Sequence, residues 1–230
     1  MPAKSKTIYL CSQCGFESPK WYGKCPSCGE WNTLIEELRA PERAAPAAGR
    51  SPSGRAAQRI GSISPQGEKR FQTGLKELDR VLGGGIVHGA LMLIGGDPGI
   101  GKSTLLLQIC QYLGRDLKIL YVSGEESERQ IKLRADRLRV DSDNLYVLCE
   151  TDMETVLEHF RADAPDLVIV DSIQTMNLAG VASSSGSVTQ VRECTNAIMR
   201  EAKSADIPVF IVGHVNKDGA IAGPKVMEHI

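Results

Sequence analysis

The spacing of apolar and polar positions changes at Phe71, where short apolar runs begin to alternate with amphipathic stretches. Five of these runs are continuous and rich in Val, Ile and Leu, which is typical of strands buried on both faces of a parallel sheet. The runs cover residues 90–94, 118–122, 145–149, 167–170 and 209–212. Their alternation with helices predicts an α/β domain of three layers around a mostly parallel sheet.

Three amphipathic helices are predicted between the strands. The first has apolar residues at i, i+3, i+4 and i+7, and Thr151 and Glu154 have the spacing of a capping box at its start. The second has Ser187 and Gln190 as its candidate capping residues. The third follows Glu125 and places its charged side chains on the face opposite its apolar positions.

The segment before this domain has a different composition. Residues 39–70 are mostly Ala, Arg, Pro, Gly and Ser, and they carry seven Lys or Arg against two acids. This pattern predicts a flexible basic linker that serves solubility and reach, or that attracts phosphates weakly. The expected organisation is a small N-terminal domain at 1–38, the linker at 39–70 and the α/β domain at 71–230.

Composition excludes some classes of protein. The chain has 230 residues, of which 42% are hydrophobic and 24% charged, which is enough to build a core. It has no apolar run of the ~20 residues that span a bilayer and no visible secretory signal, so we expect a cytoplasmic protein without a membrane partner. The net charge of −1 averages a basic linker with an acidic α/β domain, so it does not indicate whether nucleic acid is bound.

A phosphate-binding motif follows the first strand. The sequence GDPGIGKST has the form GxxxxGK[ST], in which glycines let backbone N–H groups approach phosphate oxygens at a helix N-terminus. The residues expected to hold the nucleotide are Gly96, Asp97, Pro98, Gly99, Ile100, Gly101, Lys102, Ser103 and Thr104. Lys102 is expected on the β- and γ-phosphates of ATP, and Ser103 on Mg²⁺.

Polar residues follow three other strands. Asp171 ends an apolar strand and is the candidate second protein ligand of Mg²⁺. Glu125 is the expected base that activates water, with Glu126 as the alternate; both are also acceptable as acids at a helix start. His214 ends the last strand and is either a sensor of the γ-phosphate or a structural histidine.

Four cysteines form a candidate metal site at the N-terminus. Cys11, Cys14, Cys25 and Cys28 have the spacing C-x2-C-x10-C-x2-C, which is typical of a closed tetrahedral site for structural zinc. The Gly after each second Cys permits a tight turn whose N–H groups can bond the sulfurs. A domain this small needs the metal to fold.

The remaining cysteines and the aromatic residues near the metal site have plainer interpretations. Phe16, Trp21, Tyr22 and Trp31 are expected to pack around the metal, with stacking on single-stranded bases as the alternative. The remaining cysteines are expected to be small buried thiols. They are Cys110, Cys149 and Cys194.

The order of these motifs resembles the RadA (Sms) family of bacterial DNA repair proteins. The cysteine pairs with CPSCGEW precede FQTGLKELDRVLGGG, GGDPGIGKST, VSGEE and GHVNKDGAIAGP. The resemblance covers nearly the whole chain apart from the linker. It implies a RecA-type P-loop ATPase core behind a C4 zinc ribbon, with Zn²⁺, ATP and Mg²⁺ as cofactors.

The resemblance also implies a function and partners. Family members are ring-forming, helicase-like motors, homo-hexameric when full length, that act on single-stranded or branched DNA in recombination and promote branch migration with the recombinase RecA. Glu125 matches the family's catalytic glutamate and His214 its γ-phosphate sensor. Residues 176–190 and 215–224 correspond to mobile DNA-facing loops, and Lys217 and Lys225 are the cations near them. Since family members continue past Ile230 into the rest of the core and a Lon-protease-like domain, we expect this chain to be an N-terminal portion.

Two other functions fit the same residues. A regulatory RecA-fold ATPase that acts on protein partners would share the glutamate pair, but it would not predict the C4 ribbon. A non-catalytic module would bind nucleotide and DNA without turnover.

Overall fold

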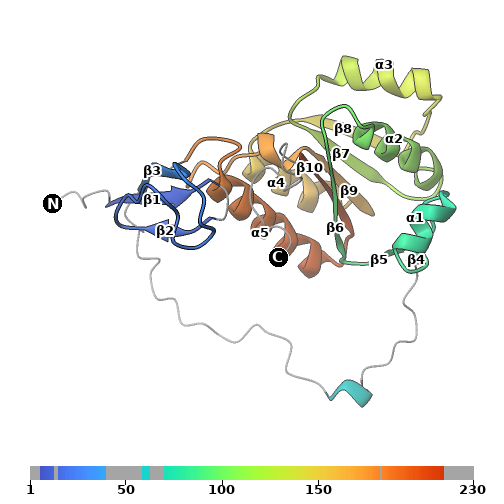
Figure 1. Cartoon of the computed structure of the whole chain (residues 1–230). Helices are drawn as coiled ribbons and strands as arrows, with labels where there is room; N and C mark the ends of the chain where they lie inside the picture. Colours follow the sequence, from blue (N-terminus) through green and yellow to red (C-terminus); the bar gives the residue numbers. More distant parts are fainter. Residues whose placement is uncertain (1–5, 13–14, 40–58, 63–69, 182, 215–230) are drawn as a thin grey trace.

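The structure is a computed structural model. It describes residues 6–12, 15–39, 59–62, 70–181 and 183–214 (Figure 1). The N-terminal residues form a small three-stranded sheet, and a larger α/β unit begins at Arg70.

A five-stranded parallel sheet forms the centre of the α/β unit. Its strands are β6 (Leu91–Gly96), β7 (Ile119–Ser123), β8 (Leu145–Cys149), β9 (Leu167–Asp171) and β10 (Val209–His214). Their spatial order is β6-β10-β9-β7-β8, and every neighbouring pair is parallel. The predicted parallel sheet is therefore confirmed, with every predicted strand in place.

Helices cover both faces of the sheet and make three layers (Figure 1). Helices α2 (Lys102–Leu113) and α3 (Glu128–Leu138) pack on one face, in a core that includes Leu106 and Ile131. Helices α4 (Met153–Asp163) and α5 (Val188–Ala205) pack on the other. The predicted α/β class is confirmed.

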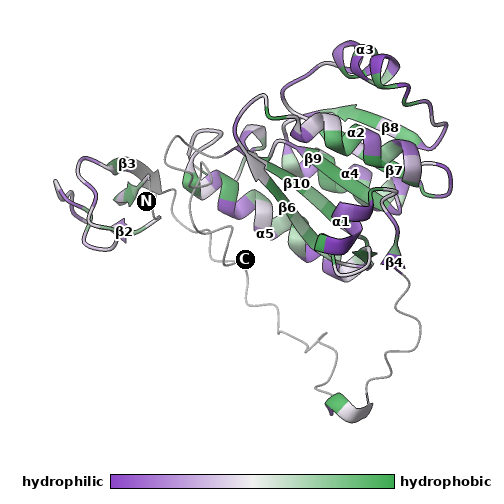
Figure 2. Ribbon diagram, turned by 45° about the vertical axis from the view of Figure 1, so that its right-hand side comes forward, coloured by the Kyte–Doolittle hydropathy of each residue, from purple (hydrophilic) through white to green (hydrophobic). Residues whose placement is uncertain are grey.

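Burial on both faces explains why the strands read as unbroken apolar runs. Every residue of β7 and β9 is buried, and these strands lie inside the sheet rather than at its edges. Figure 2 shows the central strands as mainly hydrophobic and the helices as mixtures of hydrophilic and hydrophobic residues. Burying a large aliphatic side chain is worth about 1.5–3 kcal/mol, so these strands anchor the unit.

Short elements complete the α/β unit and the linker. Strands β4 (Arg70–Phe71) and β5 (Ile86–Val87) pair antiparallel, with α1 (Lys76–Val81) between them in sequence. A 3₁₀ turn, η1, spans Ile60–Ser62, and another, η2 (Ile173–Thr175), follows β9 directly.

The N-terminal sheet has three antiparallel strands, β1 (Lys6–Cys11), β2 (Glu17–Ser18) and β3 (Leu34–Arg39), in the order β2-β1-β3. Among the described residues its buried cluster consists of Cys11, Cys25 and Leu34, with Tyr9 and Phe16 packed against it. A core this small cannot stabilise a fold by hydrophobic burial alone.

The start of α4 differs from the prediction. The expected capping box of Thr151 and Glu154 is wrong by one residue, because Asp152 is the N-cap and its carboxylate accepts hydrogen bonds from the backbone N–H groups of Glu154 and Thr155. Asp is the stronger cap since its charge also complements the helix dipole. The hydrogen bond from the Thr155 hydroxyl, outweighing partial desolvation, holds the pKa of Asp152 below its ordinary value.

We expect Asp152→Ala to lower the free energy of unfolding by about 1 kcal/mol at pH 7, whereas Thr151→Ala should change it by less than about half of that. The lowered pKa means that the contribution is present above the ordinary pKa of an aspartate, ~3.9, and is lost as the pH falls below it. Urea denaturation of the three proteins at pH 7 and pH 3 measures both effects. An equal or larger loss in Thr151→Ala would contradict the assignment of the cap.

Candidate nucleotide-binding site and metal centre

Strand register brings the candidate site residues to one edge of the sheet. His214 at the end of β10 pairs with Gly96 at the end of β6, and Asp171 at the end of β9 pairs with Ser123 at the end of β7. Because all five strands are parallel, their carboxyl ends meet at this edge, where open α/β sheets bind ligands. The phosphate motif and the polar strand ends therefore share one side of the domain.

The phosphate motif forms the turn between β6 and α2. Gly99 and Gly101 have φ angles of 80° and 105°, in the region that favours glycine. The N-cap of α2 is Gly101, so no side chain caps the first N–H groups of the helix. These groups can bind an anion together with the positive end of the helix dipole.

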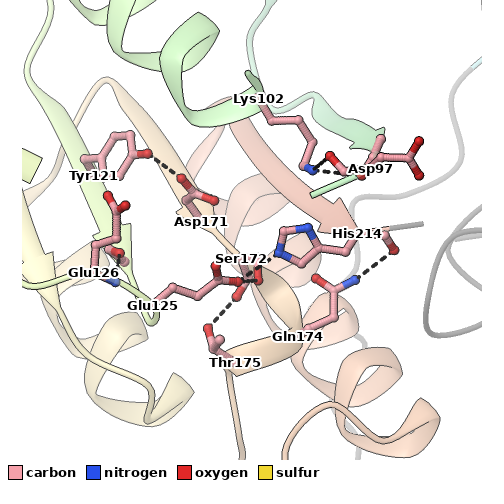
Figure 3. A network of polar contacts seen from close by, with 12 residues as sticks. Asp97, Lys102, Tyr121, Glu125, Glu126, Asp171, Ser172, Gln174, Thr175 and His214 are labelled. Carbon is pink, nitrogen blue, oxygen red and sulfur yellow. Dashed lines mark hydrogen bonds and ion pairs between the residues drawn. The ribbon is translucent and has the colours of Figure 1, made fainter. Parts of the chain in front are cut away.

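Lys102 lies folded against this turn. Its side chain is buried, and Nζ donates hydrogen bonds to the carbonyl oxygens of Gly96 (2.8 Å) and Asp97 (2.9 Å) (Figure 3). A buried ammonium that donates to neutral carbonyl oxygens is a good partner for an anionic phosphate.

Asp171 is held at the end of β9 by a tyrosine that the sequence analysis did not single out. The Tyr121 hydroxyl donates a hydrogen bond of 2.5 Å to the Asp171 carboxylate (Figure 3). Burial, with the negative charge of Asp171, raises the pKa of Tyr121, so its hydroxyl remains a neutral donor. Tyr121 lies two residues before Ser123 on β7. A hydroxyl-bearing side chain within an otherwise apolar buried strand is the sequence signal that could have identified it. The peptide bond that follows Asp171 is cis.

Glu125 lies in a network of polar side chains above the sheet edge. Its Oε1 accepts a hydrogen bond of 2.5 Å from the Ser172 hydroxyl and lies 2.9 Å from His214 Nε2 (Figure 3). Burial by itself raises the pKa of Glu125. The hydrogen bonds from Ser172 and His214, together with the charges of His214 and Lys102, have a larger effect in the opposite direction, so the pKa lies below its ordinary value. Glu125 is therefore a carboxylate at neutral pH.

Gly124 explains how Glu125 reaches this network. A Cβ at Gly124 would lie 2.0 Å from Thr175 Oγ1, so only glycine lets the end of β7 approach η2 this closely. The Gly124 N–H also donates to the carbonyl oxygen of Asp171 at 3.1 Å. The close approach brings the β7 end and the β9 end into contact.

Glu126, the alternate base, has a different partner. It forms an ion pair with Arg134 of α3, and its backbone N–H donates to the Ser123 hydroxyl at 3.1 Å. Its carboxylate is paired with an arginine, whereas that of Glu125 contacts the Ser172 hydroxyl and the His214 imidazole. The geometry separates two glutamates that the sequence analysis left as alternatives.

These residues line a cavity of about 290 Å³. Two arginines that the sequence analysis did not single out, Arg134 and Arg137, line this cavity. Their spacing by three places them on one polar face of the helix, which is the sequence signal that could have identified them. The residues that line it are Pro98, Gly99, Gly101, Lys102, Ser103, Thr104, Ser123, Glu125, Glu126, Arg134, Arg137, Asp171 and His214. Ser103 and Asp171 offer hydroxyl and carboxylate oxygens, the ligands that Mg²⁺ takes beside phosphates. The donor set thus fits a nucleotide with its metal ion.

One predicted DNA-facing loop, at 176–190, makes hydrogen bonds to the helix that follows it. Met176 at its start is fully buried, and the Gln190 amide group donates to the carbonyl oxygens of Leu178, Val181 and Ser183. Gln190, which was predicted only as a helix cap, is buried and holds the described residues at the start of this segment, and the mobility of residues 176–190 stays a prediction. Residues 215–224, with Lys217, and Lys225 lie outside the described part of the chain.

Three of the four predicted zinc ligands lie together. The Sγ atoms of Cys11, Cys25 and Cys28 are all within 4.8 Å of one another, and those of Cys11 and Cys28 are 3.7 Å apart. Four thiolates at ~2.3 Å from a tetrahedral zinc ion lie about 3.8 Å apart, so the sulfurs fit this ion. Cys14 lies outside the described residues.

Turns around the cysteines support the same site. Gly15 and Gly29 have positive φ angles of 71° and 79°, as expected of the glycine after each second Cys. Their N–H groups donate to the carbonyl oxygens of Cys11 and Cys25, at 2.9 Å each, and the predicted N–H contacts to the sulfurs stay a prediction. Each hydrogen bond closes a turn, which is how the backbone positions the thiolates.

The other cysteines and the aromatic residues divide into buried and exposed groups. Cys110 and Cys194 are fully buried, as predicted, and burial raises the pKa of each thiol to about 12. Cys149 is only partly buried. Phe16 packs against the cysteine cluster, but Trp21, Tyr22 and Trp31 are exposed, so packing around the metal is the wrong interpretation for these three.

The fold and the site together define a P-loop nucleotide-binding protein with an N-terminal zinc ribbon. The family model described as "AAA domain" matches residues 59–220, and the model described as "Rubredoxin metal binding domain" matches residues 9–36. The chain therefore belongs to the AAA-domain family. These matches confirm the predicted P-loop ATPase class and its cofactors, ATP, Mg²⁺ and structural zinc.

Particular relatives agree with the resemblance found in the motifs. The chain is 52% identical to the DNA repair protein RadA of Listeria monocytogenes, over 99% of this chain and 50% of the relative. It is 53% identical to RadA of Bacillus subtilis (99% and 51%) and 46% identical to RadA of Pseudomonas aeruginosa (99% and 51%). The resemblance to RadA proteins is confirmed, and the chain spans about half the length of the curated relatives it matches. None of the helices in the described part of the chain has the length and apolar character needed to cross a bilayer.

We expect Cys28→Ser to reduce bound zinc from one ion per chain to nearly none and to unfold residues 6–39, because the apolar cluster there is too small to replace the metal. Elemental analysis and limited proteolysis measure the two effects. Cys149→Ser, outside the ribbon, is the matched control and should retain the zinc. A Cys28→Ser protein that keeps its zinc and its protected ribbon would contradict the metal centre.

Proposed function

We propose that this chain is the nucleotide-binding part of an ATP-dependent DNA repair and recombination motor that single-stranded DNA stimulates. The observation that carries the proposal is the convergence of Lys102, Asp171 and Glu125 on one cavity: Lys102 begins α2 after β6, Asp171 ends β9 and Glu125 follows β7. The relatives named DNA repair protein RadA give the substrate class.

The roles of the residues follow from their chemistry. Lys102 and the N–H groups at the start of α2 bind the β- and γ-phosphates, so Nζ exchanges two carbonyl oxygens for anionic ones. Ser103 and Asp171 hold Mg²⁺, which neutralises phosphate charge when it is bound. Tyr121 orients the Asp171 carboxylate toward the cavity by its hydrogen bond.

Glu125 is the proposed base. It is ionised and exposed over 43% of its side chain, and it faces a hydroxyl and an imidazole rather than an arginine, so it can accept a hydrogen bond from a water that attacks the γ-phosphate. Glu126 is a positioning residue in this proposal, because its ion pair with Arg134 fixes α3 against the end of β7.

His214 is the proposed link between nucleotide and DNA. Its Nε2 contacts Glu125, and its carbonyl oxygen accepts a hydrogen bond of 3.4 Å from the Gln174 amide, on η2 just before the loop at 176–190. A change at the γ-phosphate that moves Glu125 therefore has a path to that loop. DNA contacts by residues 176–190 and by Lys217 and Lys225 are part of the proposal.

The resemblance supplies the finer parts of the proposal. They are helicase-like branch migration, action on single-stranded or branched DNA, cooperation with the recombinase RecA and assembly of the full-length protein into a homo-hexameric ring.

Steady-state ATP hydrolysis with and without single-stranded DNA tests the proposal. We expect DNA to stimulate hydrolysis and Lys102→Ala to reduce it by about 100-fold or more, since a buried cation at the phosphates is lost. Lys132→Ala, an exposed lysine paired with Asp136 on α3, is the matched control and should retain the activity. ATP binding without turnover would instead favour a non-catalytic module, and hydrolysis indifferent to DNA would favour a regulatory ATPase that acts on proteins.

A further inference from the structure

Three large aromatic side chains of the ribbon face solvent. Trp21, Tyr22 and Trp31 are 54%, 44% and 67% exposed. Exposed aromatic surface is normally minimised, and its concentration on a domain of this size marks a binding surface. The metal does not account for it, because the aromatic residues packed against the cysteine cluster in the described part of the chain are Tyr9 and Phe16.

The backbone brings the two indole rings to the same place. An antiparallel bridge pairs Lys24 with Trp31, and the Asn32 N–H donates to the Gly23 carbonyl oxygen at 2.8 Å. A Cβ at Gly23 would lie 3.6 Å from the Trp21 ring and 3.7 Å from the Trp31 ring. Both rings therefore lie next to Gly23 and form one aromatic surface, which we name the Trp21–Trp31 surface.

Cations accompany this surface. Lys24 Nζ lies 5.7 Å from the centre of the Trp31 ring, a cation–π distance, and both Lys24 and Lys20 are exposed. Residues 39–70, which follow the ribbon, carry seven Lys or Arg against two acids. Exposed aromatic rings next to lysines are suited to bind a ligand that has both flat rings and a polyanionic backbone.

We propose that the Trp21–Trp31 surface binds single-stranded nucleic acid by stacking on its bases, with Lys20 and Lys24 at the phosphates. Unpaired bases offer both faces to an indole, whereas those of a duplex are stacked on each other, so the surface selects single strands. This inference rests on the proposed function, since it gives the motor a second DNA contact, far in sequence from the nucleotide site.

The chain carries its own probe for the test. Its two tryptophans are Trp21 and Trp31, so tryptophan fluorescence reports on this surface alone. Oligothymidylate added to the zinc-loaded chain without nucleotide should quench the fluorescence to saturation. An oligomer of the same length with abasic sites keeps the phosphates and loses the bases, so it should bind at least about fivefold more weakly.

Variants separate stacking from charge. Trp31→Leu and Trp21→Leu should each weaken oligothymidylate binding, measured by fluorescence anisotropy of a labelled oligomer, by about 5- to 100-fold, and Trp31→Phe should restore most of it. Tyr146→Leu is the matched control, because Tyr146 is 50% exposed on the α/β unit and has Lys118 5.2 Å from its ring. Zinc content of one ion per chain verifies that each ribbon variant is folded.

Three results would overturn the inference: binding without quenching, equal binding of the abasic oligomer, or unchanged affinity in both leucine variants with zinc retained. A surface that instead receives a protein would give the first result. Failure of the proposed function is distinguishable, because these measurements need no ATP. Quenching without DNA-stimulated hydrolysis would contradict the proposed motor function and support the binding surface. DNA-stimulated hydrolysis without quenching would support the motor function and contradict the binding surface.

Discussion

The parallel alignment of five strands is the constraint on which the rest of the site depends. Strands buried on both faces must be apolar along their length, so polar side chains are confined to strand ends. Because the strands are parallel, those ends meet at one edge, and register places His214 beside Gly96 and Asp171 beside Ser123. The polar residues of the cavity thus come together as a consequence of the sheet.

Hydrogen bonds then give similar side chains different roles. Glu125 and Glu126 are adjacent, yet one faces a serine and a histidine while the other pairs with an arginine of α3. The close approach of Gly124 to Thr175 produces this divergence, since it brings the end of β7 against η2. In the ribbon, by contrast, a metal replaces the missing core, which leaves its tryptophans exposed for other contacts.

Local patterns predicted the elements well and the contacts between them poorly. Unbroken apolar strands, the phosphate motif and the cysteine spacing are encoded in short stretches, so the fold class, Lys102 and Asp171 were accessible from the sequence. The partners of Glu125, Glu126 and Asp171 were not, because Ser172, Arg134 and Tyr121 reach them through the packing of separate strands and α3. The α4 cap was misassigned for a related reason: Thr151 and Asp152 are both good caps, and only the backbone at Asp152 decides between them.

Single-turnover hydrolysis of ATP by Glu125→Gln and Glu126→Gln, with nucleotide affinity measured in parallel, tests the central claim that strand-end geometry makes one carboxylate the base. The account predicts that Glu125→Gln binds Mg-ATP nearly as well as the unmodified chain and hydrolyses it about 100- to 10,000-fold more slowly. Glu126→Gln should lose less than about tenfold, since its partner Arg134 lies beside the cavity rather than at the reacting phosphate. Loss of hydrolysis in Glu126→Gln, with hydrolysis retained in Glu125→Gln, would contradict it.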